Sequence, residues 1–352
     1  MSTLRKLLPV AGLSAALVVS ASAFAADYKV PRNSAGQPDF QGVWDFRNLT
    51  PLERPRELGN KATFTPEEQK AFKEKALAAV DVDQLRENAD ASTDVEGAYN
   101  AFWMDYGSHM NEDLRTSLII DPPNGRLPDL TEQGKASLKV NAERGHYPVR
   151  DLFSIGLKDF NPEGPEMLGL SERCLQGFNA GPPLTPSAYN NNLRIIQTPD
   201  HVVLLTEMVH DARVIPMAKD AKPLPGTLRR WQGDSVGRWE GDTLVIETTN
   251  FTDKTSSYQL PIDLQDPTRN GAVGTGANVH LIERLTRVSD SRLDYEYTLT
   301  DLKTFSGPFT VSIPLKATSE QMFEYACHEG NFGARNMLTG ARQAEKEAMA
   351  SK

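Results

Sequence analysis

The sequence predicts a mainly β protein in which an antiparallel meander closes into a barrel, with a helical and loop insertion and a C-terminal helix. From residue 193 onward, strand-forming segments follow one another closely, separated by turns such as Gly241-Asp242. In the segment 292–300, apolar and polar residues alternate, as in a strand with one face in the core. Consecutive antiparallel strands favour a meander, and closing it removes the exposed edges.

One β-rich domain is predicted over residues 26–352, with a partly helical insertion at about 51–190. Helices are expected from Pro66, where Thr65 and Glu68 form a capping box, and over 131–143 and 331–349. The predicted strands are 40–46, 116–120, 193–198, 201–216, 228–232, 237–240, 243–251, 279–288, 292–300, 309–317 and 322–328.

The first 25 residues have the composition of a signal peptide. Arg5 and Lys6 precede an apolar run, and Ala23-Phe24-Ala25 is a small-x-small cleavage site, so the mature chain is expected to begin near Ala26. No other apolar stretch approaches the ~20 residues of a membrane span. The sequence thus predicts a periplasmic or secreted protein without an integral membrane segment in the mature chain.

Charge and cysteine content narrow the possible partners. A formal charge of -9, with no cluster of basic and aromatic residues, gives no reason to expect nucleic-acid binding. Cys174 and Cys327 are the only cysteines, and export permits a disulfide between them. Two free thiols, or a Cys327 nucleophile beside His328, are the alternatives.

Several motifs occur together along the chain: Gly42-Val43-Trp44, Arg115–Ile119 with Asp121-Pro122-Pro123-Asn124-Gly125-Arg126, Glu172-Arg173-Cys174, Tyr189-Asn190-Asn191-Asn192, Glu207–Arg213, Trp239–Val245 and Phe323–Asn331. The set resembles an uncharacterised family of secreted bacterial proteins over nearly the whole mature chain, and this resemblance implies no activity. The Gly-x-Trp of the first strand and the meander also resemble lipocalin-like barrels, which implies a central cavity.

The strand expected over 201–216 carries polar residues although both of its faces are largely apolar. Glu207, Asp211 and Arg213 share one face, and His210 lies on the other. Buried carboxylates need a donor or a proton, so these residues form either a structural ion pair or a site in which carboxylates move protons and Arg213 binds ligand. Glu283 repeats the pattern, as an acid between Leu281 and Leu285.

The stretch Phe323–Asn331 combines several reactive side chains. A disulfide at Cys327 would fix the direction of His328 and Glu329, which suits a proton-transfer pair, and Tyr325 is a hydrogen-bond donor for a ligand. Alternatively, His328 caps the turn before the C-terminal helix. Trp239 is a candidate for stacking on a ligand ring.

The sequence predicts binding of a small organic or carbohydrate-derived molecule in the barrel cavity. Acid–base chemistry without a cofactor, as in a lyase, isomerase or hydrolase, would use Glu207, His210, Asp211, His328 and Glu329. A non-catalytic periplasmic carrier is the alternative. A third is a metal-dependent enzyme with His210, His280 and His328 as ligands, although no metal-binding spacing supports it. Substrate identity and oligomeric state stay open.

Overall fold

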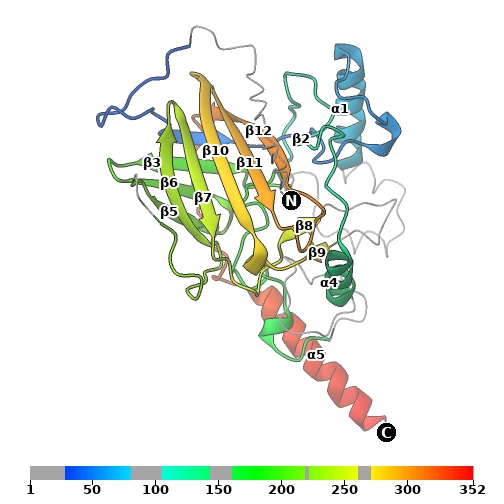
Figure 1. Ribbon diagram of the computed structural model, residues 1–352. Helices are drawn as coiled ribbons and strands as arrows, with labels where there is room; N and C mark the ends of the chain where they lie inside the picture. Colours follow the sequence, from blue (N-terminus) through cyan, green and yellow to red (C-terminus); the bar gives the residue numbers. More distant parts are fainter. Residues whose placement is uncertain (1–27, 81–104, 143–160, 219–221, 261–270, 352) are drawn as a thin grey trace, which may run out of the picture.

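The computed structural model describes residues 28–80, 105–142, 161–218, 222–260 and 271–351, and the expected signal peptide lies outside them. The described chain is mainly β, as predicted, with helices at its margins (Figure 1). The strands are β1 (Gly42–Asp45), β2 (Ile119–Asp121), β3 (Asn192–Gln197), β4 (His201–Thr206), β5 (Ala212–Pro216), β6 (Asp234–Glu240), β7 (Thr243–Thr249), β8 (Tyr258–Leu260), β9 (Gly271–Val273), β10 (His280–Ser289), β11 (Arg292–Thr300) and β12 (Phe309–Thr318); the α-helices are α1 (Pro66–Val80), α4 (Glu132–Ala142) and α5 (Phe332–Ala350).

Nine strands form one continuous antiparallel path in the order β5-β4-β3-β1-β12-β11-β10-β7-β6, and β2 pairs with β12 beside it. The sheet curls on itself, because its end strands β5 and β6 approach each other. An isolated bridge joins Met217, next to β5, to Gly237 of β6. A Cβ on Gly237 would lie 2.4 Å from Met217 Sδ, so a larger residue there would force the Met217 side chain to move. The described residues show no continuous ladder between β5 and β6.

The main core lies on the concave side of the sheet. In β11, Leu293, Tyr295, Tyr297 and Leu299 are all at most 1% exposed, whereas their polar neighbours face outward. Strands β10 and β12 flank β11 in register, and each alternates in the same way. This period-two burial, which was predicted for 292–300, holds the register because a slip of one residue would expose the apolar side chains.

The expected single strand over 201–216 is instead a hairpin. Strands β4 and β5 are antiparallel, with Leu204 opposite Arg213, and the segment between them turns back through one short 3-10 turn. Within that turn Val209 and His210 have φ values of 58° and 42°. Non-glycine residues seldom adopt positive φ, so the residue types at these two positions did not predict a turn. The shared face predicted for Glu207 and Arg213 is therefore wrong.

Two other predicted strands are absent from the described chain. Residues 228–232 form a turn linked to Phe251 by one bridge from Arg230, and residues 322–328 run without a strand partner. In contrast, β8 and β9 lie where no strand was predicted, and they pair with each other in a separate two-stranded sheet. A strand needs a neighbour as well as a suitable sequence, and residues 322–328 pair with none of the described strands.

The helices begin where the capping residues predict. The Thr65 backbone N–H donates to Glu68 Oε2 at 2.7 Å, and the Glu68 N–H donates to Thr65 Oγ1 at 3.2 Å, which completes the capping box of α1. Asn331 caps α5 by accepting from the Ala334 N–H. Figure 1 shows α5 extending away from the sheet. None of the helices in the described ranges combines the length and apolar character of a membrane span.

The predicted disulfide between Cys174 and Cys327 is confirmed, with the two Cα atoms 5.9 Å apart. It ties the segment that precedes α5 to the loop before β3. A small cluster of Met208, Val209 and Tyr325 packs around it, separate from the main core. The disulfide is compatible with secretion.

Candidate functional site

A cavity of about 540 Å³ lies between the end strands β5 and β6. The strands touch through Met217 and Gly237, but alongside Asp211–Pro216 and Gly233–Val236 they separate and line the cavity. Since β5 pairs only with β4 and β6 only with β7, the strand edges that face the cavity have no ladder partner among the described residues. A ligand in this position can meet backbone N–H and C=O groups as well as side chains.

The inner wall of the cavity contains a buried ion pair. Arg213 of β5 is 8% exposed and donates to both carboxylate oxygens of Glu283, at 2.8 and 2.9 Å. Glu283 lies on β10, the seventh strand in an order that begins with β5, so the pair crosses the interior of the curled sheet. The Tyr295 hydroxyl donates to Glu283 Oε1 at 2.8 Å and accepts from the Leu184 N–H at 3.1 Å.

In these contacts each charged group is paired: the Arg213 guanidinium and the Tyr295 hydroxyl both bond to the Glu283 carboxylate. Burial by itself would lower the pKa of Arg213, but Glu283 raises it above the usual value, so the guanidinium stays charged. Burial and the neighbouring Glu283 raise the pKa of Tyr295 well above the usual range, so the hydroxyl keeps its proton. The sequence left two roles open for Arg213: a structural ion pair with Glu207 or Asp211, and a ligand anchor. The structure shows a bidentate ion pair, but its partner is Glu283, and the position of Arg213 on the cavity wall is compatible with the second role.

Asp211 lines the cavity just before β5. Burial raises the pKa of its carboxyl above the usual aspartate value, opposed in part by hydrogen bonds from the Gly177 backbone and the Gln232 side chain. The Gly177 N–H lies 3.5 Å from Oδ2, which makes this bond a weak one. Asp211 can therefore keep its proton at a higher pH than an ordinary aspartate does, which suits a group that exchanges protons with a ligand.

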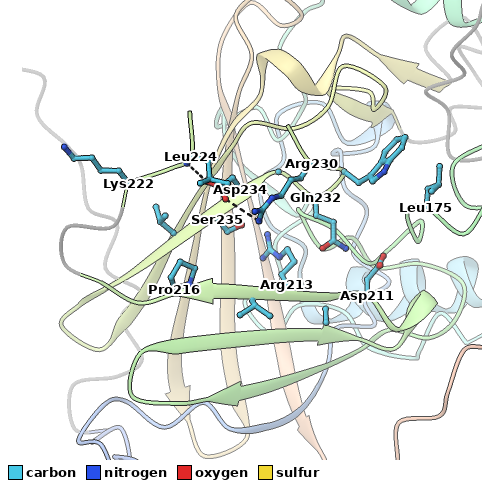
Figure 2. A pocket seen from close by; sticks show the side chains of 15 residues that line it. Leu175, Asp211, Arg213, Pro216, Lys222, Leu224, Arg230, Gln232, Asp234 and Ser235 are labelled. Carbon is cyan, nitrogen blue, oxygen red and sulfur yellow. Dashed lines mark hydrogen bonds and ion pairs between the residues drawn. The ribbon is translucent and has the colours of Figure 1, made fainter. Parts of the chain in front are cut away.

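The opposite rim comes from the turn that leads into β6. Arg230 makes an ion pair with Asp234 at 3.6 Å, and Asp234 also accepts from the Leu224 N–H at 2.6 Å. Figure 2 shows Arg213 and Arg230 directed toward the middle of the cavity, with Asp211 and Gln232 together at one end. Trp231, the residue between Arg230 and Gln232, also lines the cavity.

Glu207, His210 and Tyr325 lie away from this cavity, where they attach the C-terminal stretch to the sheet. Glu207 is 5% exposed; it accepts from Asn192 Nδ2 at 2.8 Å and from the Phe323 N–H at 2.9 Å. His210 is exposed, and its Nδ1 lies 2.9 Å from the Tyr325 carbonyl. Both Glu207 oxygens are thus occupied by structural bonds, and neither residue lines the cavity.

His328 and Glu329 lie on the surface, in the turn before α5. The His328 carbonyl accepts from the Asn331 N–H, which places the backbone of His328 in that turn. Trp239 packs against the main core, with its ring 5.4 Å from that of Phe40. Of the predicted site residues, Asp211 and Arg213 line the cavity, and Glu283 is bonded to Arg213. His328, Glu329 and Trp239 do not line it.

Sequence reasoning missed the residues of the turn before β6. Arg230, Trp231, Gln232 and Asp234 were expected on or beside a strand, but Gly233 has a φ of 70° and a Cβ there would lie 2.6 Å from the Thr249 carbonyl. The Gln-Gly-Asp sequence was the available signal, since glycine before aspartate is typical of turns. Polar residues in a turn beside a sheet end are common binding residues.

Within the described ranges, no group of three or more His, Cys, Asp and Glu side chains lies close enough to hold a metal ion. His280 makes a surface contact with Glu247, at 2.8 Å from Nε2 to Oε1. The chain matches no family model, and neither curated proteins nor solved structures gave a significant match.

Proposed function

We propose that the protein binds a small oxygen-rich organic molecule, such as a sugar or sugar acid, in the cavity between β5 and β6. In this proposal the curled sheet is a lipocalin-like barrel that opens on the β5–β6 side, and export places the protein in the periplasm or outside the cell. The observation that carries it is the meeting of Arg213, Asp211 and Gln232 with Trp231 around one cavity.

The lining suits hydroxyl and carboxylate groups. Arginine, carboxyl and carboxamide side chains are planar and bind pairs of neighbouring oxygens, while an indole covers the apolar face of a sugar ring. A volume of about 540 Å³ falls in the range of small-molecule sites. Because Arg213 is already fixed by Glu283, it can bind a ligand without first losing side-chain freedom.

The charges around the cavity favour a ligand of low net charge. Arg213, Lys222 and Arg230 are opposed by Glu283, Asp234 and, when ionised, Asp211. This balance leaves no strong positive field of the kind that polyphosphates require. A neutral sugar or a monocarboxylate meets the same groups without a large electrostatic penalty.

Isothermal titration of neutral monosaccharides and uronic acids tests this proposal. We expect one class to bind, and Gln232→Ala to weaken its binding at least tenfold by removing a hydrogen-bonding group from the cavity. Gln321→Ala, at an exposed position that does not line the cavity, is the matched control and should bind like the wild type. Absence of binding to the whole panel, or equal affinity of both variants, would overturn the proposal.

Acid–base catalysis on the same ligand is the second candidate, and the raised pKa of Asp211 favours it. Asp211 would transfer the proton and Arg213 would anchor the substrate in a lyase, isomerase or hydrolase reaction. Asp211→Asn should then retain binding and lose turnover. If the bound molecule is recovered unchanged after long incubation with the wild type, the protein is a carrier rather than an enzyme.

A further inference from the structure

A second cavity, of about 380 Å³, lies next to the first. Trp231 lines both. The loop after Cys174 also continues from one to the other: Leu175 borders the first cavity, and the next residues, Gln176 to Phe178, border the second. The two cavities are therefore neighbours separated by one indole and one short stretch of backbone.

The backbone between the cavities is held firmly. Cys174 is bonded to Cys327, directly before this stretch. At Gly177, a Cβ would lie 2.5 Å from Met208 Cγ and 3.0 Å from Ala180 Cβ, so the loop packs as closely as glycine allows. A ligand that reaches both cavities would meet a preformed partition, which reduces the entropy lost on binding.

The second cavity has a different chemistry from the first. It is lined by the rings of Phe178, Phe251 and Tyr258 and by three prolines, with no charged side chain among its lining residues. Flat, apolar walls of this kind favour an aromatic ring, which can pack edge to face against the phenyl groups. A strongly hydrated group such as a carboxylate would lose its water here without finding a charged partner.

Two polar groups beside this cavity have unused hydrogen-bonding capacity. Ser257 and Gln259 are lining residues, and Ser257 Oγ and Gln259 Oε1 have no hydrogen-bond partner in the described structure. Ser257 is 6% exposed. Buried polar atoms are almost always paired, so an exception beside a cavity points to a partner carried by the ligand. A hydroxyl on the ring would supply the donor that a carboxamide oxygen needs.

We infer that the ligand is a two-part conjugate, a hydroxylated aromatic ring joined to an oxygen-rich group, as in a hydroxyphenyl glycoside. The oxygen-rich half occupies the first cavity and the ring occupies the second, with Trp231 between them. The assignment of the first half rests on the proposed function, whereas the ring subsite rests on the second cavity alone.

Calorimetric titration with three kinds of probe tests this inference: free monosaccharides and uronic acids, hydroquinone, and the 4-hydroxyphenyl glycosides of the same sugars. The matching glycoside should bind at least tenfold more tightly than its free sugar and than hydroquinone. Phenyl glycosides, which lack the ring hydroxyl, should lose part of that gain. A glycoside that binds no more tightly than its free sugar would overturn the two-part ligand.

A variant with a large side chain in the second cavity tests whether the aromatic ring binds there. Thr185 lines it and is only partly buried, so Thr185→Trp should block the ring without unfolding the core; circular dichroism and thermal melting check this. We expect the variant to lose hydroquinone binding and the extra affinity of the glycoside while binding free sugar as before. Thr339→Trp, at an exposed position on α5, is the control.

The outcomes separate this inference from the proposed function. If hydroquinone binds and Thr185→Trp abolishes that binding while no free sugar binds, the ring subsite is supported and the function proposed for the first cavity fails. If free sugar binds to the wild type but hydroquinone does not, the ring subsite is refuted and the first proposal stands. Equal glycoside affinity of a folded Thr185→Trp and the wild type also refutes the subsite.

Discussion

The cavity between β5 and β6 and the C-terminal stretch Phe323–Asn331 carry similar kinds of polar residue but hold them differently. In the first region, Arg213 and Glu283 are buried and bonded to each other. In the second, His328 and Glu329 are exposed on a turn. Judged by residue type alone, both regions contain side chains that could transfer protons or bind a ligand. The difference teaches that a polar residue within an apolar alternation is forced to find partners, and those partners build a site.

The largest effect expected from this difference concerns Arg213. Arg213→Met leaves the Glu283 carboxylate buried without its partner and should lower the free energy of unfolding by about 3–5 kcal/mol. His328→Ala, on the exposed turn, should change it by less than about 0.5 kcal/mol. Urea denaturation of both variants measures the contrast.

A second substitution separates the charge from the packing. Glu283→Gln removes the unpaired charge and keeps an oxygen that accepts from Tyr295. Arg213→Met/Glu283→Gln should therefore recover at least half of the stability that Arg213→Met loses. Equal losses in the single and double variants would show that the guanidinium acts through packing alone.

The next effect concerns the disulfide. It closes a loop spanning 153 residues, so Cys174→Ser/Cys327→Ser should lower the free energy of unfolding by about 2–4 kcal/mol. It should also weaken ligand binding, because the loop after Cys174 borders both cavities. A reducing agent should change the wild type in the same way and leave the double variant unaffected, since the chain has no other cysteine.

The smallest effect is the pH dependence from Asp211. Its folded pKa is raised above the usual 3.8, so the folded state binds more protons than the unfolded state between the two values, and stability falls as the pH rises through that window. Asp211→Asn abolishes this loss. The variant should match the wild type below about pH 3.8 and exceed it at higher pH. Thermal melts across that range test the expectation; parallel curves for both proteins would contradict it.

The strands that the sequence predicts correctly are those with a partner on each side and one face in the core. In β10 and β11, Glu283 and Tyr295 lie two residues after Leu281 and Leu293 and so share their buried face, which follows from the period of two. The disulfide was predictable for a different reason: the chain has only two cysteines, so one pairing is possible, and the predicted export made a disulfide the expected state.

Other features depended on information that the local pattern does not contain. The hairpin after Thr206 reverses at Val209, a β-branched residue that rarely adopts positive φ. The stretch 322–328 alternates like a strand but pairs with none of the described strands, and its own sequence does not show whether a partner is present. The approach of β5 to β6 brings Trp231 and Gln232 to Arg213, and residues brought together by a curled sheet leave no spacing signal in the chain.

Both proposals place the ligand beside Arg213 and assign the C-terminal stretch a structural role. The most direct test compares two double variants by titration with the sugar or glycoside that the wild type binds best. Arg230→Ala/Gln232→Ala should weaken binding at least tenfold, whereas His328→Ala/Glu329→Gln should stay within about twofold of the wild type. Unchanged binding in Arg230→Ala/Gln232→Ala, together with loss of binding in His328→Ala/Glu329→Gln, would contradict the account and show that the ligand binds at the C-terminal stretch.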